Sequence, residues 1–149
     1  MTLFEQVSEG IIAAMKAREK EKLEALRNLK KTMLEARSAK GAGSELTDEE
    51  SLKLIQKLVK QGRESALIYE NQKRQDLADQ EINQVKVLEA YLPQPLTDDE
   101  LTAAISAVIQ ETGATSIKDM GKVIGIASKK LAGKAEGRDI SAKVKALLS

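Results

Sequence analysis

The sequence of 149 residues contains no histidine, no cysteine and no tryptophan. Without histidine or cysteine, the chain cannot form a Ser-His-Asp or Cys-His catalytic centre, a Cys/His zinc site, an iron–sulfur cluster or a histidine proton shuttle. A di-iron helical bundle is excluded for the same reason, because its Glu-x-x-His motifs need histidine. We therefore expect no metal, and any chemistry would rest on carboxylates, lysines or hydroxyls.

Aromatic residues are also scarce, since the chain has only Phe4, Tyr69 and Tyr91. These rings are too few for the stacking platforms with which proteins bind single-stranded RNA. They are also too few to line an aromatic cofactor pocket, so we expect no cofactor.

Long apolar runs are missing as well. The longest uncharged apolar stretch, residues 10–15, is far shorter than the roughly 18 residues that a membrane-spanning helix needs. The N-terminus carries Glu5 where a secretory signal would carry basic residues. We expect a cytoplasmic protein without membrane contact, and the absence of cysteine agrees with a reducing compartment.

What the sequence does contain is a repeated signal for the start of helices. A hydroxyl residue followed three positions later by an acid has the spacing of a capping box. In this box the hydroxyl accepts a first-turn N–H, and the acid lies near the positive end of the helix dipole. The pairs with this spacing are Thr2 with Glu5, Thr47 with Glu50, Thr97 with Glu100, and Ser116 with Asp119.

Apolar residues recur three and four positions apart, which places them on one face of a helix. These stripes predict helices over residues 4–15, 23–33, 52–69 and 78–92, followed by shorter ones over 101–108, 117–131 and 140–147. Strand signals are nearly absent. The sequence therefore predicts an all-α protein, with an N-terminal four-helix part of long antiparallel helices and a small C-terminal three-helix domain.

The prolines mark the clearest boundary in the chain. Pro93 and Pro95 follow residue 92, and neither can continue a helix interior. We predict an N-terminal domain at 1–92, a linker at 93–96 and a C-terminal domain at 97–149. A turn is expected at 41–44, where Gly41 and Gly43 tolerate positive φ. A break at 18–21 is predicted with no glycine or proline to mark it.

The formal net charge of +1 conceals a segregation of charge. Residues 96–112 carry four acids and no base, whereas residues 113–149 carry eight bases against three acids, a net of +5. A second basic excess lies at 16–40, with nine bases against four acids. Each cluster fits either a solvated helix face or a surface that binds phosphates and releases their counterions.

Glycines accompany the bases of the last third, at Gly121, Gly125, Gly133 and Gly137. Gly121 and Gly125 share one helix face, and the simpler interpretation is that they let a neighbouring helix pack closely, as we also expect of Gly62. The alternative is that the glycines let a sugar-phosphate backbone approach the protein near positive helix N-termini. Gly133 is interpreted as the end of the sixth helix.

Several motifs stand in a fixed order in the second half of the chain. They are Tyr91-Leu92-Pro93 followed by Leu96 and Glu100-Leu101, then DMGKVIG at 119–125, then GKAEGR at 133–138. Together they resemble the GatB/YqeY family. Leu26-Arg27 and the long charged third helix are similar to the stand-alone YqeY-like proteins, so the resemblance covers essentially the whole chain.

The resemblance implies a C-terminal domain similar to the tail of the B subunit of the tRNA-dependent amidotransferase. In that enzyme the tail helps to hold the misacylated tRNA, while other parts transfer ammonia from glutamine to the aminoacyl group. A related module occurs on some glutaminyl-tRNA synthetases, again on the tRNA side. The implied partners are tRNA and an amidotransferase or aminoacyl-tRNA synthetase. The implied RNA contacts are Lys122, Lys134 and Arg138, with Lys129 and Lys130 as neighbours.

Two residues depart from the family pattern. Ile124 stands where methionine is common, which is a volume-conserving exchange. Glu136 stands where aspartate is common, and glutamate is a poorer helix cap, so the last helix is expected to fray or to begin nearer Asp139. The chain also lacks the catalytic portion of the B subunit, so amidotransferase activity is not carried over to it.

Three functions can be ranked from the sequence. The leading hypothesis is a tRNA-binding accessory module related to glutamine-dependent carbon–nitrogen ligation, which recognises the tRNA backbone by shape and charge with little base reading. The alternative is a helical adaptor for a synthetase or amidotransferase complex. A self-sufficient enzyme ranks third, because the charged residues occupy the polar sides of helices. We expect no catalytic residues, although a Lys/Glu active site stays open.

Overall fold

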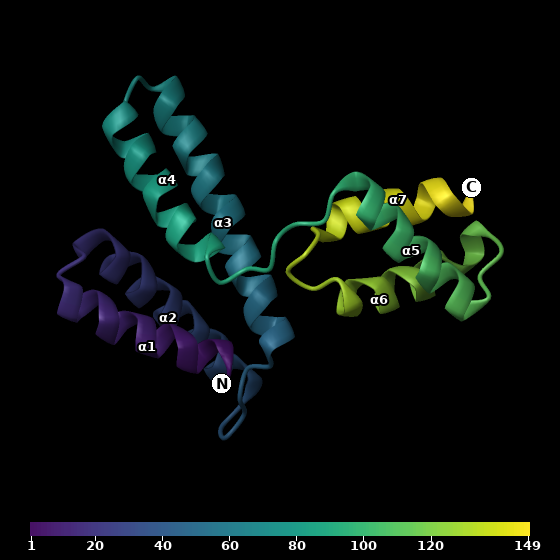
Figure 1. Ribbon diagram of the computed structural model, residues 1–149, viewed down its shortest axis with the longest axis horizontal. Helices are drawn as coiled ribbons and strands as arrows, with labels where there is room; N and C mark the ends of the chain where they lie inside the picture. Colours follow the sequence, from purple (N-terminus) through teal and green to yellow (C-terminus); the bar gives the residue numbers. More distant parts are fainter. The chain divides into compact units, whose positions relative to one another are not determined.

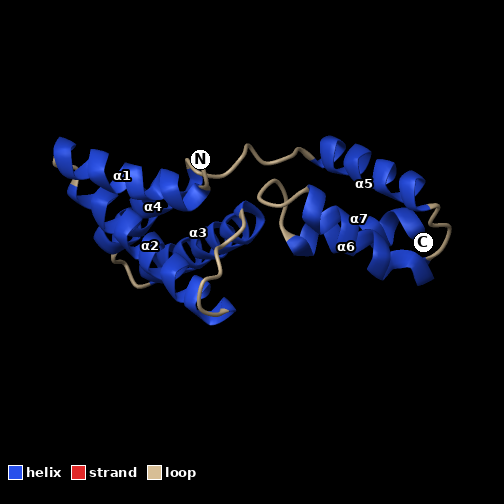
Figure 2. Cartoon of the chain, turned by 90° about the horizontal axis from the view of Figure 1, so that it is seen from below, coloured by secondary structure: helices blue, strands red, loops and turns tan.

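The computed structural model describes residues 1–149 and is entirely helical, as the sequence predicts (Figure 1, Figure 2). The elements are α1 (Leu3–Ala17), α2 (Lys20–Lys40), α3 (Asp48–Asn71), α4 (Gln75–Glu89), α5 (Asp98–Thr112), the 3₁₀ turn η1 (Ile117–Asp119), α6 (Met120–Lys130) and α7 (Gly137–Leu148). The chain forms two compact units, unit 1 at Met1–Leu92 and unit 2 at Pro93–Ser149.

Unit 1 consists of two helical hairpins. α1 packs along α2, α3 packs along α4, and α2 joins the hairpins through α4 (Figure 1). The buried core has contributions from all four helices, at Val7, Leu26, Leu29, Met33, Ile55, Val59, Val85 and Leu88. All eight of these residues lie on the predicted stripes. The first stripe runs too far, because Met15 is 52% exposed, and the helix buries Ala14 instead.

Three of the four predicted capping boxes are confirmed. Thr2, Thr47 and Thr97 each accept a hydrogen bond from the backbone N–H three residues later, and the acid at that position accepts one in return. The fourth is wrong, because the Ser116 side chain makes no cap hydrogen bond. The Asp119 carboxylate instead accepts the backbone N–H of Thr115 at 3.2 Å, and residues 117–119 form a 3₁₀ turn ahead of α6.

In each hairpin of unit 1, the turn between the two helices contains a basic residue in the left-handed backbone conformation. Arg18 has φ 59° and Lys73 has φ 60°, a region that favours glycine. The turn after α1 is closed by backbone hydrogen bonds from Arg18 to Met15 and from Glu19 to Ala14. The break predicted at 18–21 is therefore real, although it has no glycine.

Two glycines let neighbouring helical segments of unit 1 approach closely. A Cβ atom at Gly62 of α3 would lie 2.6 Å from the Val85 Cγ2 atom of α4, and one at Gly10 of α1 would clash with the Tyr91 hydroxyl. The interpretation of Gly62 as a position of close helix packing is confirmed. Ser51, in the first turn of α3, is 1% exposed, and its hydroxyl has no hydrogen-bond partner.

Unit 2 is a three-helix cluster with its own core, formed by Leu101, Ile105, Val108, Val123, Ala127, Leu131, Ile140 and Val144. Each of α5, α6 and α7 packs against the other two. The segment before α5 is tied to the turn before α7, because the Leu96 N–H donates to the Lys134 carbonyl at 3.0 Å. Ile117 and Leu147, both assigned to core stripes from the sequence, are 47% and 39% exposed.

Candidate nucleic-acid interface

The exposed side of α6 carries a row of glycines and lysines. Gly121, Lys122, Gly125 and Lys129 are all exposed, and their spacings of one, three and four residues place them on one side of the helix. The opposite side carries the buried residues Val123 and Ala127. We call these four exposed residues the Gly–Lys face.

The glycines of the Gly–Lys face do not serve helix packing. A Cβ atom at Gly121 or Gly125 would meet no atom within 4 Å. The interpretation that this pair lets a neighbouring helix approach is therefore wrong, because α6 packs through its other side. An exposed glycine inside a helix costs about 1 kcal/mol relative to alanine. No packing contact at Gly125 offsets this cost within unit 2.

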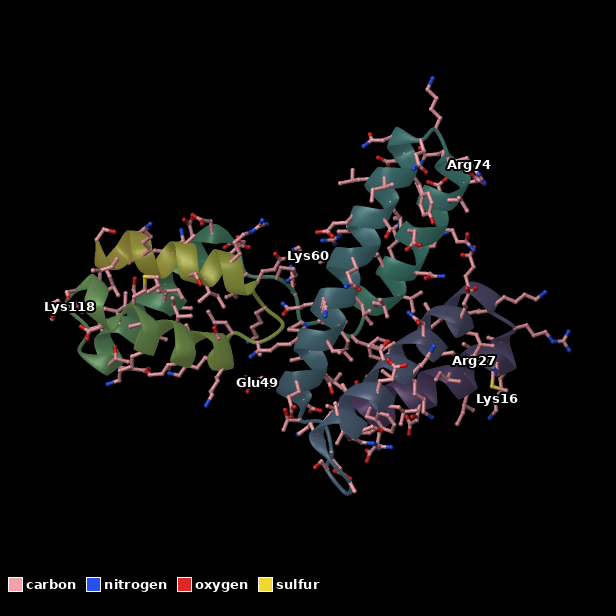
Figure 3. The ribbon with its side chains drawn as sticks, turned by 180° about the vertical axis from the view of Figure 1, so that it is seen from behind. Lys16, Arg27, Glu49, Lys60, Arg74 and Lys118 are labelled. Carbon is pink, nitrogen blue, oxygen red and sulfur yellow. The ribbon has the colours of Figure 1, made fainter.

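The lysines of this face are free to meet an external anion. Lys122 and Lys129 are exposed and form no ion pair. They lie seven residues apart, which corresponds to about 10 Å along a helix that rises about 1.5 Å per residue. Lys118, in the turn η1 that leads into α6, is a further exposed cation at the end of unit 2 (Figure 3).

Lys130, which the resemblance assigned to the same set, is held differently. Its ammonium lies 2.5 Å from the Glu111 carboxylate of α5, so its charge is partly neutralised within unit 2. Lys143 of α7 is likewise paired with Asp98 of α5 at 2.7 Å. The structure therefore distinguishes Lys122 and Lys129, which form no ion pair, from Lys130, whose ion pair with Glu111 links α6 to α5.

Lys134 and Arg138 come from the segment that follows α6. Gly133 is buried with φ 79°, which lets the chain reverse after the last turn of α6. Lys134 follows it and is exposed, while its backbone N–H and carbonyl are both hydrogen-bonded, to Leu131 and Leu96. Arg138 is exposed in the first turn of α7 and forms no ion pair.

The start of α7 has no side-chain cap. Glu136 occupies the N-cap position without a side-chain hydrogen bond, as expected of a poor capping residue. The expected shift of the helix start toward Asp139 is nevertheless wrong, because α7 begins at Gly137. A Cβ atom at Gly137 would meet nothing within 4 Å. This helix terminus therefore presents uncapped first-turn N–H groups beside Arg138.

Negative charge in unit 2 gathers at the start of α5. Asp98, Asp99 and Glu100 form its first turn, near the positive end of its dipole. Hydrogen bonds from the Thr97 backbone N–H, and then from its hydroxyl, lower the pKa of Glu100. These three acids stabilise the start of α5. The bases of unit 2 without an ion pair lie in η1, on α6, in the turn after α6 and on α7.

The structure offers no arrangement that suggests a metal site or a membrane span. No group of three or more acidic side chains is placed to hold a metal ion. None of the helices combines the length and the apolar character that crossing a membrane requires.

The fold and the exposed basic face define an all-α protein with a compact, glycine- and lysine-bearing C-terminal helical unit. The family model described as Yqey-like protein matches residues 4–148. The chain belongs to the YqeY-like family, which is related to the C-terminal region of the amidotransferase B subunit. A search of curated proteins found no match.

Proposed function

We propose that unit 2 binds tRNA and that the protein is an accessory module related to glutamine-dependent tRNA amidotransferases. The observation that carries this proposal is the Gly–Lys face, where two glycines with open space above them alternate with two unpaired lysines. A side chain at either glycine would stand between the helix and a ligand. A surface that keeps glycine there, at a cost in helix stability, suits close contact with a sugar-phosphate backbone.

Recognition in this proposal is by charge and shape. Lys122, Lys129, Lys134 and Arg138 would contact phosphates, and the start of α7 would add backbone N–H donors. Unit 2 contains no tyrosine, phenylalanine or tryptophan on which a base could stack. The protein would therefore bind the folded backbone of a tRNA and read few bases. We assign the module no catalytic step of its own.

The direct test is an electrophoretic shift with total tRNA across a salt series. Replacing Lys122, Lys129, Lys134 and Arg138 together by alanine should weaken binding strongly. It should also reduce the slope of log affinity against log salt by about 0.7 to 0.9 for each lost phosphate contact. The matched control replaces Lys57, Lys60, Lys73 and Lys86 of unit 1, which are also exposed and unpaired.

The outcome separates the proposed surface from a general effect of charge. Loss of affinity in both variants would mean that total charge, and not this surface, governs binding. An unchanged affinity and salt slope in the unit 2 variant would show that the surface is wrong. Turnover of misacylated tRNA with glutamine by the purified protein alone would contradict an accessory role.

The second candidate function is a helical adaptor for a synthetase or amidotransferase complex. It is favoured by large apolar side chains left in solvent on α1, where Ile12 is 54% and Met15 52% exposed. An affinity pulldown from nuclease-treated lysate distinguishes the two functions. Partners that persist after RNA digestion favour the adaptor, and partners that disappear favour bridging by RNA.

A further inference from the structure

Unit 1 has a groove between α1 and α2 whose floor is apolar. The groove has a volume of about 530 Å³, and we call it the α1–α2 groove. It is lined by Ile11 of α1 and by Arg27, Lys30, Lys31, Leu34, Glu35 and Ser38 of α2. Ile11 is half-buried and Leu34 is 36% exposed, so aliphatic carbon faces solvent at its base.

The rim of the α1–α2 groove is basic. Arg27, Lys30 and Lys31 follow one another at the spacing of a single helix face, against one acid, Glu35. The ammonium of Lys30 lies over the Phe4 ring, 5.7 Å from its centroid, which fixes one of the three cations. Arg27 and Lys31 have no ion pair, so their charges are unneutralised. Figure 3 shows Arg27, together with Lys16 of α1, on this helical pair.

A groove with an apolar floor and a cationic rim is complementary to a ligand that has apolar groups along its middle and anionic groups beside them. A nucleic acid would satisfy the cations but would gain nothing from Ile11 and Leu34. A lipid surface would contact a projecting amphipathic face better than a groove between two helices. A helix with leucine-like residues along one face and acids beside them would fill the floor and pair with the rim.

We propose that the α1–α2 groove binds an acidic amphipathic helix of a partner protein. Apolar side chains of that helix, spaced three and four residues apart, lie on Leu34 and Ile11, and flanking Glu or Asp side chains meet Arg27 and Lys31. The interaction uses unit 1 alone. It is therefore independent of tRNA binding by unit 2, and either proposal can fail without the other.

The test uses the full-length protein and three fluorescent synthetic helices, with binding followed by anisotropy. The first peptide has leucine at every third and fourth position with glutamate beside it. The second replaces each glutamate with lysine, and the third keeps glutamate but replaces leucine with serine. Only the first should bind at low salt. Equal binding of the lysine peptide or the serine peptide would overturn the proposal, as would no binding of the first.

Protein variants locate the binding. Arg27→Glu combined with Lys31→Glu should reduce affinity for the first peptide by about tenfold or more, because two attractive pairs become repulsive. Leu34→Ser should also weaken binding several-fold by removing part of the floor. The matched control is Lys57→Glu with Lys60→Glu on α3, which changes the net charge equally and should retain more of the affinity. Circular dichroism confirms the helical fold of every variant.

The same variants decide between a protein and the other two ligand classes. If Arg27→Glu with Lys31→Glu leaves peptide binding intact but abolishes binding to tRNA or to phosphatidylserine vesicles, the groove is an anion surface and the proposal is wrong. If peptide affinity falls and tRNA affinity stays within about twofold of the wild type, the two binding surfaces are separate.

Discussion

Glycine has opposite consequences at positions 62 and 125. At Gly62 a methyl group would lie 2.6 Å from the Val85 Cγ2 atom, whereas at Gly125 it would meet nothing within 4 Å. Overpacking at a close contact costs about 1 to 3 kcal/mol, and alanine in a helix gains about 1 kcal/mol over glycine. The same substitution should therefore change stability in opposite directions at the two sites.

We expect Gly62→Ala to lower the free energy of unfolding of unit 1 by about 1 kcal/mol, and Gly125→Ala to raise that of unit 2 by about 1 kcal/mol. Hydrogen exchange of core amides in each unit measures both. If Gly125 serves only the fold, its alanine variant keeps full tRNA affinity. If the Gly–Lys face binds the backbone, the variant is more stable and binds more weakly. Destabilisation by Gly125→Ala would contradict the open space seen at that position.

The Ser51 hydroxyl is buried without a hydrogen-bond partner. Removing an unsatisfied buried polar group removes its desolvation cost, and the methyl side chain of alanine is smaller than the serine side chain by only the hydroxyl. Ser51→Ala should leave unit 1 equally stable or stabilise it by up to about 1 kcal/mol. The control is Ser51→Val, whose larger side chain should destabilise the same site. Loss of stability in Ser51→Ala, measured by urea unfolding, would reveal a hydrogen bond to water.

The Glu50 carboxylate accepts hydrogen bonds from three neighbouring donors. The Lys40 ammonium at 2.7 Å, followed by the Thr47 backbone N–H and hydroxyl, lowers the pKa of Glu50 to about 2. Because the folded-state pKa lies below the ordinary value of 4.5, the associated stability is present above pH 4.5 and is lost as the pH falls toward 2.

Lys40→Met should raise the pKa of Glu50 toward its ordinary value, because the largest cause of the shift is removed. Carboxyl carbon chemical shifts in an NMR titration follow this directly. The control is Lys53→Met, which removes the ion pair between Lys53 and Glu49 and should leave the pKa of Glu50 unchanged. An unchanged Glu50 titration in Lys40→Met would show that Thr47 alone sets the shift.

At the scale of elements, the helix starts test how closely sequence determines local structure. Thr97 caps α5 through its side chain, whereas Ser116 makes no cap hydrogen bond to the helical segment that follows it. Thr97→Ala should lower the free energy of unfolding of unit 2 by about 1 kcal/mol, and Ser116→Ala should change it by only a few tenths. Thermal unfolding of both variants measures this. Equal losses would mean that Ser116 caps η1 in solution.

Helix positions and most of the core followed from periodicity, because burying one face of each helix leaves a pattern in the sequence. Two features of the structure could not be predicted from periodicity. The turns at Arg18 and Lys73 adopt positive φ because two antiparallel helices must be joined in a few residues, a requirement set by packing and absent from local propensity. The glycine spacing at 121 and 125 fits packing and exposure equally, and only the burial of Val123 and Ala127 on the other side decides between them.

The sequence predicts which residues make up the candidate site, but it does not predict which of them form ion pairs. The sequence indicates which segment is basic, but it gives Lys129 and Lys130 the same role as neighbours of the predicted RNA contacts. The structure distinguishes them because Glu111 lies near Lys130 in space, at a separation of 19 residues. Electrostatic neutralisation by a residue of another helix has no signature in a single sequence.

At the scale of the whole molecule, each unit has its own hydrophobic core. The full chain should therefore unfold in more than one step, with unit 2 the less stable, because a chain of fewer than about 60 residues buries a smaller share of its surface. Urea unfolding followed by residue-resolved hydrogen exchange measures both units. Fragments 1–92 and 93–149 should each retain helical structure. A single cooperative transition for all core amides would contradict independent units.

The contact between Gly10 and Tyr91 gives unit 1 a built-in optical reporter. Burial raises the pKa of the Tyr91 phenol above its ordinary value of 10.0, so its contribution to stability is complete below pH 10 and is lost as the pH rises further. Because the chain has no tryptophan and only one other tyrosine, near-ultraviolet absorbance of phenolate reports these two groups alone. We expect one of the two phenolate transitions to occur above pH 10 and to disappear in Tyr91→Phe. An alkaline titration would then report, without any label, whether α1 is packed against Tyr91.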